Sequence, residues 1–452
     1  MSADGPPRRD TDPPPGSADA RPDRGEAGAR RGAEAADAFL RTVENGDAAG
    51  ARAHLEAHSE LPETSLSVAA ALGREADVRR LLEVDPGRVH EKAGASSPAT
   101  PLLWLCFSPF HGESAERDQG LEASARALLD AGADPNTRDA RHGVPALYGV
   151  TGLNHAPAIA RLLLEAGAAV DDGESVFHAA ERYHLEALEL LLEYGVDLNA
   201  RGDWGNTPLY FLLRYWDVAG RPNVERGLRW LLDHGADPNV LCDRDLRENS
   251  LHAAVRRGQD PRIVELLLEH GADVHAPRGD GRTPWLLARR GGLDDLAALL
   301  EEAGASPEPL GPADELLAAC GRGDVEEARR LAHPDTVAAL EAEDHELLAR
   351  AATDGRLGAV RAYIAAGFPV DAAEDDGVTP VHYAAIHGRA AVVRELLAAG
   401  ADHSIRDREH DATPMGWARF GAEFMPDPGG DYAETIRALV DAGAAREGEV
   451  PE

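Results

Sequence analysis

A short phrase recurs along most of this 452-residue chain and constrains its fold more than any other feature. The phrase reads Leu-Leu-x-x-Gly-Ala-Asp-x-Asn at residues 128–136 and 231–239, and a close copy ends at His275. Weaker copies lie between and after these, and from Gly132 onward the glycines of successive copies are 28 to 43 residues apart except for one gap of 63. The long gap is nearly twice the usual one, which indicates a degenerate copy inside it. A period near 33 residues predicts stacked repeats rather than a set of unrelated globular domains.

Many copies carry a second phrase, Thr-Pro followed by an apolar residue, about 21 residues before the glycine, as at Thr283 and Thr379. A threonine can cap the N-terminus of a helix, and proline fits the first turn, where no backbone donor is needed. A glycine such as Gly258 or Gly388 then ends this short helix in a left-handed conformation. The next segment, for example residues 263–268, has apolar residues at helical spacing. This pattern therefore predicts two helices and a turn in each repeat.

On these two phrases the chain resembles the ankyrin-repeat family, and in particular the long bacterial multi-ankyrin proteins without an attached catalytic domain. The resemblance implies an all-α solenoid of about 12 helix-turn-helix units over residues 33–446, with protruding turns. Residues 1–32, rich in Pro, Gly and Arg, are expected to form a disordered tail, and 447–452 a polar C-terminal tail. The prolines within 306–312 mark the place where an articulation of the array is expected.

In this family the turns and first helices line a concave groove that binds other proteins, so the resemblance implies a non-catalytic protein–protein interaction scaffold. A preorganised groove that presents aromatic and arginine side chains suits this role, because such residues dominate binding energy at interfaces. Aligning the repeats places sixteen residues on the expected groove: Asp203, Trp204, Asn206, Arg214, Tyr215, Asp245, Leu246, Glu248, Arg256, Arg257, Asp280, Arg282, Asp375, Asp376, Ile386 and His387. Trp204 stands out because a turn beside Gly205 gives a large ring little to pack against, although it could lie on a neighbouring turn.

The formal net charge of −34 at pH 7 bears on the partner. An acidic surface repels phosphate, so we expect no direct binding to nucleic acid or to an anionic membrane. It favours a protein partner with a basic patch. One alternative is that the acidic surface imitates a nucleic acid and inhibits a DNA- or RNA-binding protein, which would need regularly spaced carboxylates along the groove. Acidic composition is also an ordinary route to solubility.

Several features bear on the compartment. No window approaches the roughly 20 apolar residues of a membrane helix, and the N-terminal residues lack the apolar segment of a secretory signal. The three cysteines, Cys106, Cys242 and Cys320, are far apart, which predicts reduced thiols rather than disulfides. Lys92 is the only lysine, and the excess of arginine and alanine is typical of a GC-rich bacterial coding bias. We expect a cytoplasmic, monomeric bacterial protein.

Three histidines share one position of the repeat. His252 and His382, together with His178, occupy the fourth position of a Thr-Pro-Leu-His phrase. In the ankyrin family this histidine hydrogen-bonds the adjacent turn, so the resemblance implies a structural role. No cysteine has a Cys-x-x-Cys partner. Because zinc needs about four ligands at compatible spacing, we expect no metal site.

The patterns of known catalytic and cofactor sites are also missing from the sequence. It has no Gly-x-Ser-x-Gly phrase, and a single lysine leaves no phosphate-binding loop of the Gly-Lys-Ser type, so we expect no catalytic or cofactor site. A hydrolase remains the third hypothesis, built from Cys106, His111, Glu113 and Asp118 around the segment 108–120. It would need the thiol within hydrogen-bonding reach of an imidazole. The alternative is a buried thiol beneath a polar loop.

Three repeats are longer than the others and carry inserts at 108–120, 217–224 and 421–431. Each insert follows aromatic residues spaced about three or four apart, which predicts that these residues lie on one face of a lengthened first helix. Two interpretations are open. The aromatic side chains either pack beneath the inserted loops or, where exposed, anchor a partner.

Overall fold

The computed structural model describes residues 24–95, 98–213, 220–242, 247–373 and 376–444. Every regular element within them is a helix, and their only β-pairings are the isolated bridges Ala93–Ala99 and Arg138–Pro145. The fold is all-α, as the sequence predicts. None of the helices described in these ranges is both long and apolar enough to cross a membrane.

The chain divides into two units. Unit 1 comprises Met1–Val150 and Asn154–Ala168, and unit 2 comprises Thr151–Leu153 and Ala169–Glu452. The helices of unit 1 are α1 (Arg24–Glu44), α2 (Ala48–Ala57), α3 (Leu61–Thr64), α4 (Leu66–Ala71), α5 (Glu75–Val84), the 3₁₀-helix η1 (Pro86–His90), α6 (Pro101–Cys106), α7 (Ala115–Asp130), α8 (Ala146–Tyr148) and α9 (Pro157–Glu165). The π-helical turn η2 (Gly149–Leu153) spans the division.

Unit 2 contains the remaining helices. They are α10 (Ser175–Arg182), α11 (Leu185–Glu193), α12 (Pro208–Leu212), α13 (Pro222–Asp233), α14 (Ser250–Arg256), α15 (Pro261–Glu269), α16 (Pro284–Arg290), α17 (Asp294–Glu302), α18 (Pro312–Arg322), α19 (Val325–Leu331), α20 (Pro334–Ala338), α21 (Ala342–Thr353), α22 (Leu357–Ala365), α23 (Pro380–Ile386), α24 (Ala390–Ala398), α25 (Pro414–Phe424) and α26 (Tyr432–Asp441).

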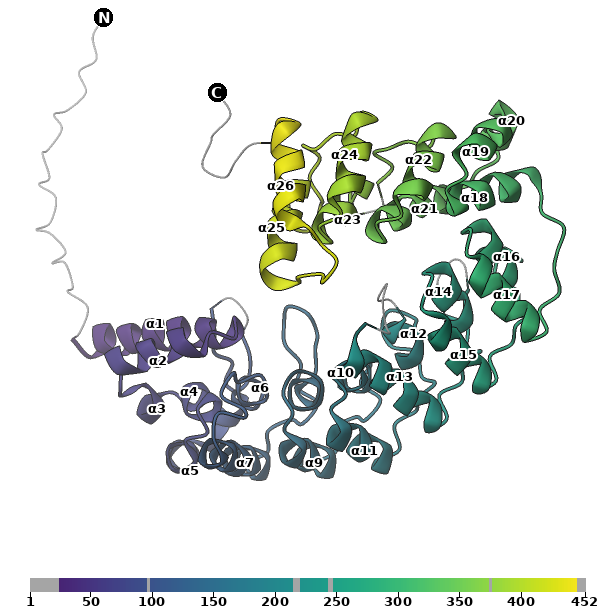
Figure 1. Cartoon of the computed structure of the whole chain (residues 1–452). Helices are drawn as coiled ribbons and strands as arrows, with labels where there is room; N and C mark the ends of the chain where they lie inside the picture. Colours follow the sequence, from purple (N-terminus) through teal and green to yellow (C-terminus); the bar gives the residue numbers. More distant parts are fainter. Residues whose placement is uncertain (1–23, 96–97, 214–219, 243–246, 374–375, 445–452) are drawn as a thin grey trace, which may run out of the picture. The chain divides into compact units, whose positions relative to one another are not determined.

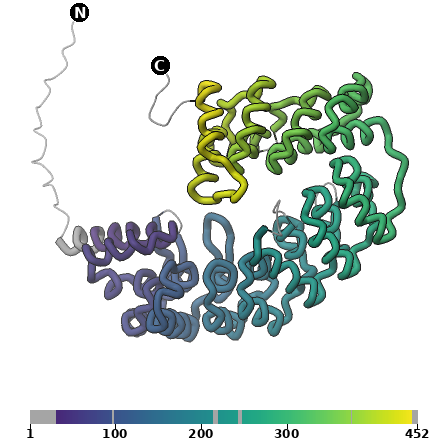
Figure 2. Tube along the Cα trace, viewed as in Figure 1, coloured from purple at the N-terminus to yellow at the C-terminus, as the bar shows by residue number. Residues whose placement is uncertain are grey.

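The described helices form consecutive pairs (Figure 1). With the short helices α3, α20 and η1 set aside, and α8 taken together with η2, there are twelve pairs, which agrees with the predicted number. Figure 2 traces the chain through them. In unit 2 the first helices of neighbouring pairs pack side by side, as α14 does with α16, and so do second helices, as α15 does with α17.

The ends of the predicted array differ in part from the sequence boundaries. Helix α1 begins at Arg24, upstream of residue 33, where the array was expected to start. Residues 1–23 and 445–452, which include most of the expected tails, lie outside the described residues. The expected articulation at 306–312 lies inside unit 2, where residues 305–311 connect α17 to α18 without regular secondary structure.

Polar caps, prolines and glycines delimit several of the first helices as predicted, whereas α10 has no side-chain cap and ends at Tyr183 in the left-handed conformation. The hydroxyl of Thr283 accepts a hydrogen bond from a backbone N–H of α16 at 3.3 Å, and Pro284 occupies the first turn. The side chain of Asn249 caps α14 and accepts from the backbone of His252 at 3.1 Å. Gly258 follows α14 at φ +60°, a conformation that glycine adopts without the steric cost of a Cβ atom.

The Gly-Ala-Asp-x-Asn phrase connects the turn of one repeat to the next. The side chain of Asn239 donates to the carbonyl of Gly271 at 2.9 Å and accepts from the backbone N–H of Asp273 at 2.8 Å. Asn199 makes the same two bonds with the equivalent residues of the following repeat. The aspartate of the phrase accepts a backbone N–H two residues later, as Asp237 does at 2.9 Å. The regular spacing of these carboxylates, which a nucleic-acid mimic would need, therefore has a structural cause.

Candidate functional site

The sixteen residues predicted to line the groove fall into three groups. Arg214, Tyr215, Asp245, Leu246 and Asp375 lie outside the described residues. Glu248, Arg256, Asp280 and Arg282 meet in one set of ion pairs in unit 2. The remaining seven are Asp203, Trp204, Asn206, Arg257, Asp376, Ile386 and His387.

Of these seven, only the turn before α12 presents a large exposed ring. Trp204 keeps 69% of its surface exposed, whereas Asn206 in the same turn is buried. Asp203 and Asp376 are exposed, and Arg257 and Ile386 are half-buried. The ring nitrogen Nδ1 of His387, at the end of α23, lies 3.3 Å from a carboxylate oxygen of Asp427, so His387 is partnered within the chain.

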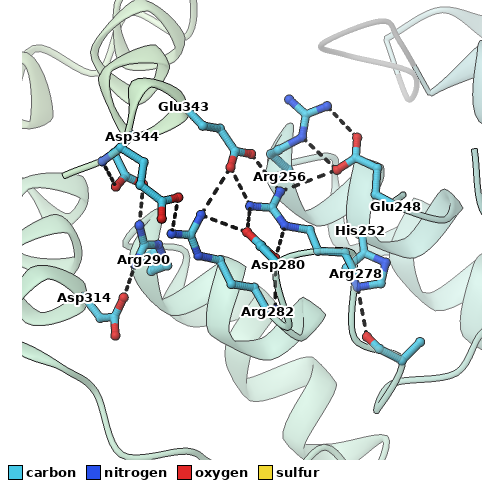
Figure 3. Close-up of polar contacts among 12 residues, drawn as sticks. Glu248, His252, Arg256, Arg278, Asp280, Arg282, Arg290, Asp314, Glu343 and Asp344 are labelled. Carbon is cyan, nitrogen blue, oxygen red and sulfur yellow. Dashed lines mark hydrogen bonds and ion pairs between the residues drawn. The ribbon is translucent and has the colours of Figure 1, made fainter. Parts of the chain in front are cut away.

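The ion pairs of the second group belong to a larger network in unit 2 (Figure 3). We call it the arginine–carboxylate network and define it by nine residues: Glu248, Arg256, Arg278, Asp280, Arg282, Arg290, Asp314, Glu343 and Asp344. At its centre Arg278 donates to both oxygens of Glu343, at 2.7 and 2.5 Å, and to both of Asp280, at 2.9 and 2.7 Å. Arg282 also donates to Glu343, at 3.2 Å. A carboxylate of α21 is thereby joined to the turn that precedes α16.

Two further groups extend the network to either side of Arg278. Arg256, the last residue of α14, donates two hydrogen bonds to Glu248, at 3.1 and 2.7 Å, and the hydroxyl of Tyr210 donates a third at 2.5 Å. On the other side, Arg290 of α16 is bonded to two aspartates, one from α18 and one from α21. The planar guanidinium suits such two-pronged contacts with carboxylates.

The centre of the network is removed from solvent. The side chain of Arg278 is fully buried and that of Glu248 is 3% exposed. Burial raises the pKa of the Glu248 carboxyl, but the charge and hydrogen bonds of Arg256 and the hydroxyl of Tyr210 outweigh it and hold the pKa at about 2. This carboxylate keeps its charge at neutral pH and has no proton to exchange in acid–base chemistry. The arrangement instead ties α14 and α16 to α21.

The residues that complete the network were not predicted from the sequence. Arg278 and Glu343 are 65 positions apart and belong to repeats that are not consecutive. The only sequence signal is complementarity between the Arg-Gly-Asp-Gly-Arg turn at 278–282 and the Glu-Ala-Glu-Asp run at 341–344. That signal does not say which repeats meet.

The three inserts resolve into different environments. In the first, Trp104 and Phe110 are buried, at 4% and 1% exposure, so these aromatic residues pack beneath the loop. Helix α6 ends at Cys106, before the insert, so the expectation of a lengthened first helix is wrong there. In the second, Phe211 packs edge-on against Phe177 at 5.5 Å, and residues 217–219 lie outside the described ranges.

The third insert leaves apolar side chains on the surface. Helix α25 has 11 residues and is lengthened, as expected. Phe420, Phe424 and Met425 are 49%, 64% and 45% exposed, and we call them the C-terminal aromatic patch. The two phenylalanine rings lie 5.1 Å apart. Trp417 on the same helix is instead tied to Asp407 by a 2.9 Å hydrogen bond from its indole nitrogen.

The residues of the hydrolase hypothesis are occupied by other contacts. Burial raises the pKa of the Cys106 thiol, so the thiol is protonated at neutral pH and a weak nucleophile. The ring of His111 is bonded to the carbonyl of Leu105 at 2.9 Å. Glu113 is paired with an arginine, and Asp118 accepts a backbone N–H. These contacts hold the loop in place.

The histidines of the Thr-Pro-Leu-His position bind the neighbouring turn. Nε2 of His252 and of His382 lies 2.9 and 3.2 Å from a backbone carbonyl of the next repeat. The structural role is thereby confirmed for these two. His178 differs, because its ring nitrogens lie 2.7 and 3.3 Å from two glutamates of its own repeat. Within the part of the chain that the structure describes, no three His, Cys, Asp or Glu residues are arranged to hold a metal ion.

Acidification should destabilise the array through His252 and His382. Burial lowers the pKa of both rings, so they stay neutral in the folded chain at a pH where the unfolded chain, with a pKa near 6.5, binds protons. Below about pH 6.5 the unfolded state therefore holds more protons, and the free energy of unfolding falls as the pH falls. Denaturant unfolding at about pH 7.5 and 5.5 should show a larger loss for the wild type than for the double variant His252→Asn/His382→Asn.

Equal losses in the two proteins would contradict this account. The contribution of His178 to the pH dependence of stability has the opposite sign. Burial lowers its pKa, but the two neighbouring glutamates raise the pKa by more. It is present in both proteins, so its contribution cancels in the comparison.

Comparison with known proteins agrees with this architecture. The family model described as "Ankyrin repeats (3 copies)" matches residues 150–240, 218–309 and 316–407, together more than half of the chain. The chain is 30% identical over 189 residues to the putative ankyrin repeat protein YahD of Escherichia coli K12, a match that covers 40% of this chain and 74% of that protein. It is 32% identical over 186 residues to human SH3 and multiple ankyrin repeat domains protein 2, covering 40% of this chain but only 10% of the human protein.

Among solved structures, the ankyrin repeat domain of human ASB11 is similar with a TM-score of 0.41 and 24% identity. The match covers 54% of this chain and all of that domain. The segments matched by the family model, together with the likeness to YahD, lead to one conclusion. The chain belongs to the ankyrin-repeat family.

Proposed function

We propose that this chain is a non-catalytic scaffold that binds another protein through the turns and first helices of its repeats. Ankyrin-repeat proteins generally mediate interactions between proteins. The observation that carries the proposal for this chain is the C-terminal aromatic patch, which comprises Phe420 and Phe424 on the lengthened first helix α25 and Met425 directly after it.

The patch has the chemistry of a binding anchor. Residues 420 and 424 are one helical turn apart, so their rings lie on one face of α25 and are 5.1 Å from each other. Leaving apolar surface in water costs about 25 cal/mol per Å², a cost that a partner would remove by covering it. Clustered exposed apolar side chains on a protein surface commonly mark interaction sites, whereas single ones do not.

The charge of the chain supports a choice of partner. The net charge is −34, and Glu423 beside the patch is exposed. A partner that presents an apolar side chain flanked by basic groups would complement both features. Such an association should weaken as ionic strength rises, and binding that is equal at about 50 and 500 mM NaCl would remove the electrostatic part of the proposal.

The three cysteines are free and buried, which fits a reducing compartment, so we also propose a cytoplasmic location and a monomeric state. Sedimentation of the full chain as a dimer would contradict the monomer.

The test uses a partner isolated by affinity capture and then measured as a purified protein. The variant Phe420→Ser/Phe424→Ser should weaken its binding by about tenfold or more, since truncating a central aromatic anchor costs over 1 kcal/mol. The matched control is Val84→Ser, because Val84 is 78% exposed at the end of the second helix α5. The control should bind as the wild type does.

Cross-linking of the complex supplies an independent result. Cross-links to the turns and first helices are expected, with a cluster on α25. Cross-links confined to the second helices, or full affinity in the double variant, would refute binding through this surface.

A further inference from the structure

A cavity of about 40 Å³ lies in unit 2 beside the arginine–carboxylate network. Side chains of α14, α16, α21 and the turn before α16 line it, and they include five arginines, Arg256, Arg278, Arg282, Arg290 and Arg350, against three carboxylates. A single water molecule needs roughly 10–15 Å³, so the space is larger than one water requires. Five guanidinium groups at one cavity are unusual in a chain whose net charge is −34.

Four of the five arginines are neutralised by carboxylates within the network. Arg256 is paired with Glu248 at 2.7 Å, and Arg278 and Arg282 share Glu343 at 2.5 and 3.2 Å. Arg290 is paired with two aspartates, one of which, Asp344, also faces the cavity. Two of the three carboxylates that line the cavity, Glu343 and Asp344, are therefore already bound to arginines other than Arg350. They do not cancel the charge of the fifth arginine, Arg350.

Arg350 of α21 is the exception. It is 5% exposed, and its Nε and Nη2 atoms have no hydrogen-bond partner among the described residues. Its ion pair with Asp354 is long, with Nε and Oδ2 3.9 Å apart. A buried donor without an acceptor is destabilising, and a buried charge more so.

The guanidinium of Arg350 packs closely against Gly258. A Cβ atom on Gly258, the residue that follows α14, would lie 2.0 Å from Nη2 of Arg350. Burial, outweighing the attraction of Asp354, lowers the pKa of Arg350 to about 10, so the group is still charged at neutral pH. The site therefore holds a positive charge at neutral pH, with two buried donors that have no acceptor among the described residues.

We propose that this cavity binds a small oxyanion of the size and charge of inorganic phosphate or sulfate, with Arg350 as its main ligand. The fork of the guanidinium matches the oxygen spacing of such anions, and Arg350 can donate from Nε and Nη2 together. Glu343 and Arg282 keep 19% and 14% of their side chains exposed, which gives the anion a route in from solvent. Because the cavity is lined from α14, α16 and α21, the bound anion would add a link between these helices.

The experiment measures thermal unfolding of the full chain in a phosphate-free buffer to which inorganic phosphate, sulfate or chloride is added at equal ionic strength. Phosphate at about ten times its dissociation constant should raise the melting temperature by about 2–4 °C, and chloride should not. Arg350→Met should abolish the shift. The control Arg329→Met should keep it, since Arg329 lies on α19 with 58% of its side chain exposed.

A measurement on the wild type alone keeps the test decisive if Arg350→Met does not fold. The ³¹P line of inorganic phosphate should broaden in the presence of the protein and sharpen again when sulfate, but not chloride, is added. Equal phosphate shifts in wild type and Arg350→Met, equal effects of chloride and phosphate, or no broadening of the ³¹P line would each overturn the proposal. So would tighter binding of glucose 6-phosphate than of phosphate, because a sugar phosphate is too large for this cavity and would be bound elsewhere.

Discussion

Replacing Arg278 by methionine should lower the free energy of unfolding by about 3 kcal/mol, because it removes the buried arginine that several carboxylates share and leaves them with less compensating charge. The side chain of Arg278 is fully buried and bonded to both oxygens of Glu343 and of Asp280. Without it, Glu343 and Asp280 keep Arg282 as a shared partner, at 3.2 and 3.1 Å, but lose the two-pronged contacts that neutralise them from the buried side. Denaturant unfolding of Arg278→Met against the wild type measures the loss.

A double-mutant cycle separates this effect from the loss of packing. Glu343→Leu alone should also lower the free energy of unfolding. The double variant Arg278→Met/Glu343→Leu should lose less stability than the sum of the two single losses, since apolar groups of similar volume tolerate burial without partners. Arg329→Met serves as the control, because its pair with Glu326 is exposed, and it should change stability by less than about 0.5 kcal/mol. A cost below about 1 kcal/mol for Arg278→Met, or strict additivity in the cycle, would show that the network does not hold these repeats together.

The sequence pattern of the repeat predicts the helices but not the arginine–carboxylate network. The cap at Thr283, the left-handed Gly258 and the turn-binding His252 each depend on contacts within a repeat or with the next one, and such contacts repeat with the sequence period. The pairing of Arg278 with Glu343 instead joins repeats that are not consecutive. No residue in either repeat encodes that by its type or spacing alone.

The inserts illustrate the same limit at the level of single side chains. Phe110 and Phe424 each belong to an insert that follows regularly spaced aromatic residues, and sequence reasoning left both packing and binding open. Phe110 is buried because arginines at 52 and 117 lie over its ring, with their guanidinium carbons 5.7 and 5.6 Å from its centroid. Phe424 ends its helix with 64% of its surface exposed. Whether side chains from other helices cover the ring decides the outcome, and that depends on tertiary structure.

Adding one methyl group at Gly421 should lower the stability of the chain nearly as much as breaking the arginine–carboxylate network. Gly421 lies in α25, and a Cβ atom there would stand 2.1 Å from the carbonyl oxygen of Ile386 at the end of α23. The obstacle is backbone that also accepts a 3.0 Å hydrogen bond from the hydroxyl of Tyr432, so it cannot move without disturbing a second contact. Overpacking of this kind costs about 1–3 kcal/mol, and more where the backbone must shift, so we expect about 3 kcal/mol for Gly421→Ala.

The same helix offers a matched control. Gly416→Ala places its Cβ 3.4 Å from the nearest atom, the Cβ of Ala412, which is an ordinary contact. This variant should gain up to about 1 kcal/mol from the higher helix propensity of alanine. Because repeat arrays can lose a terminal pair without unfolding globally, amide hydrogen exchange over residues 414–441 is the direct readout. Amide exchange of α25 and α26 should be faster in Gly421→Ala but not in Gly416→Ala. Equal protection in the two variants would mean that the close approach of α25 to α23 does not stabilise the last repeat and its aromatic patch.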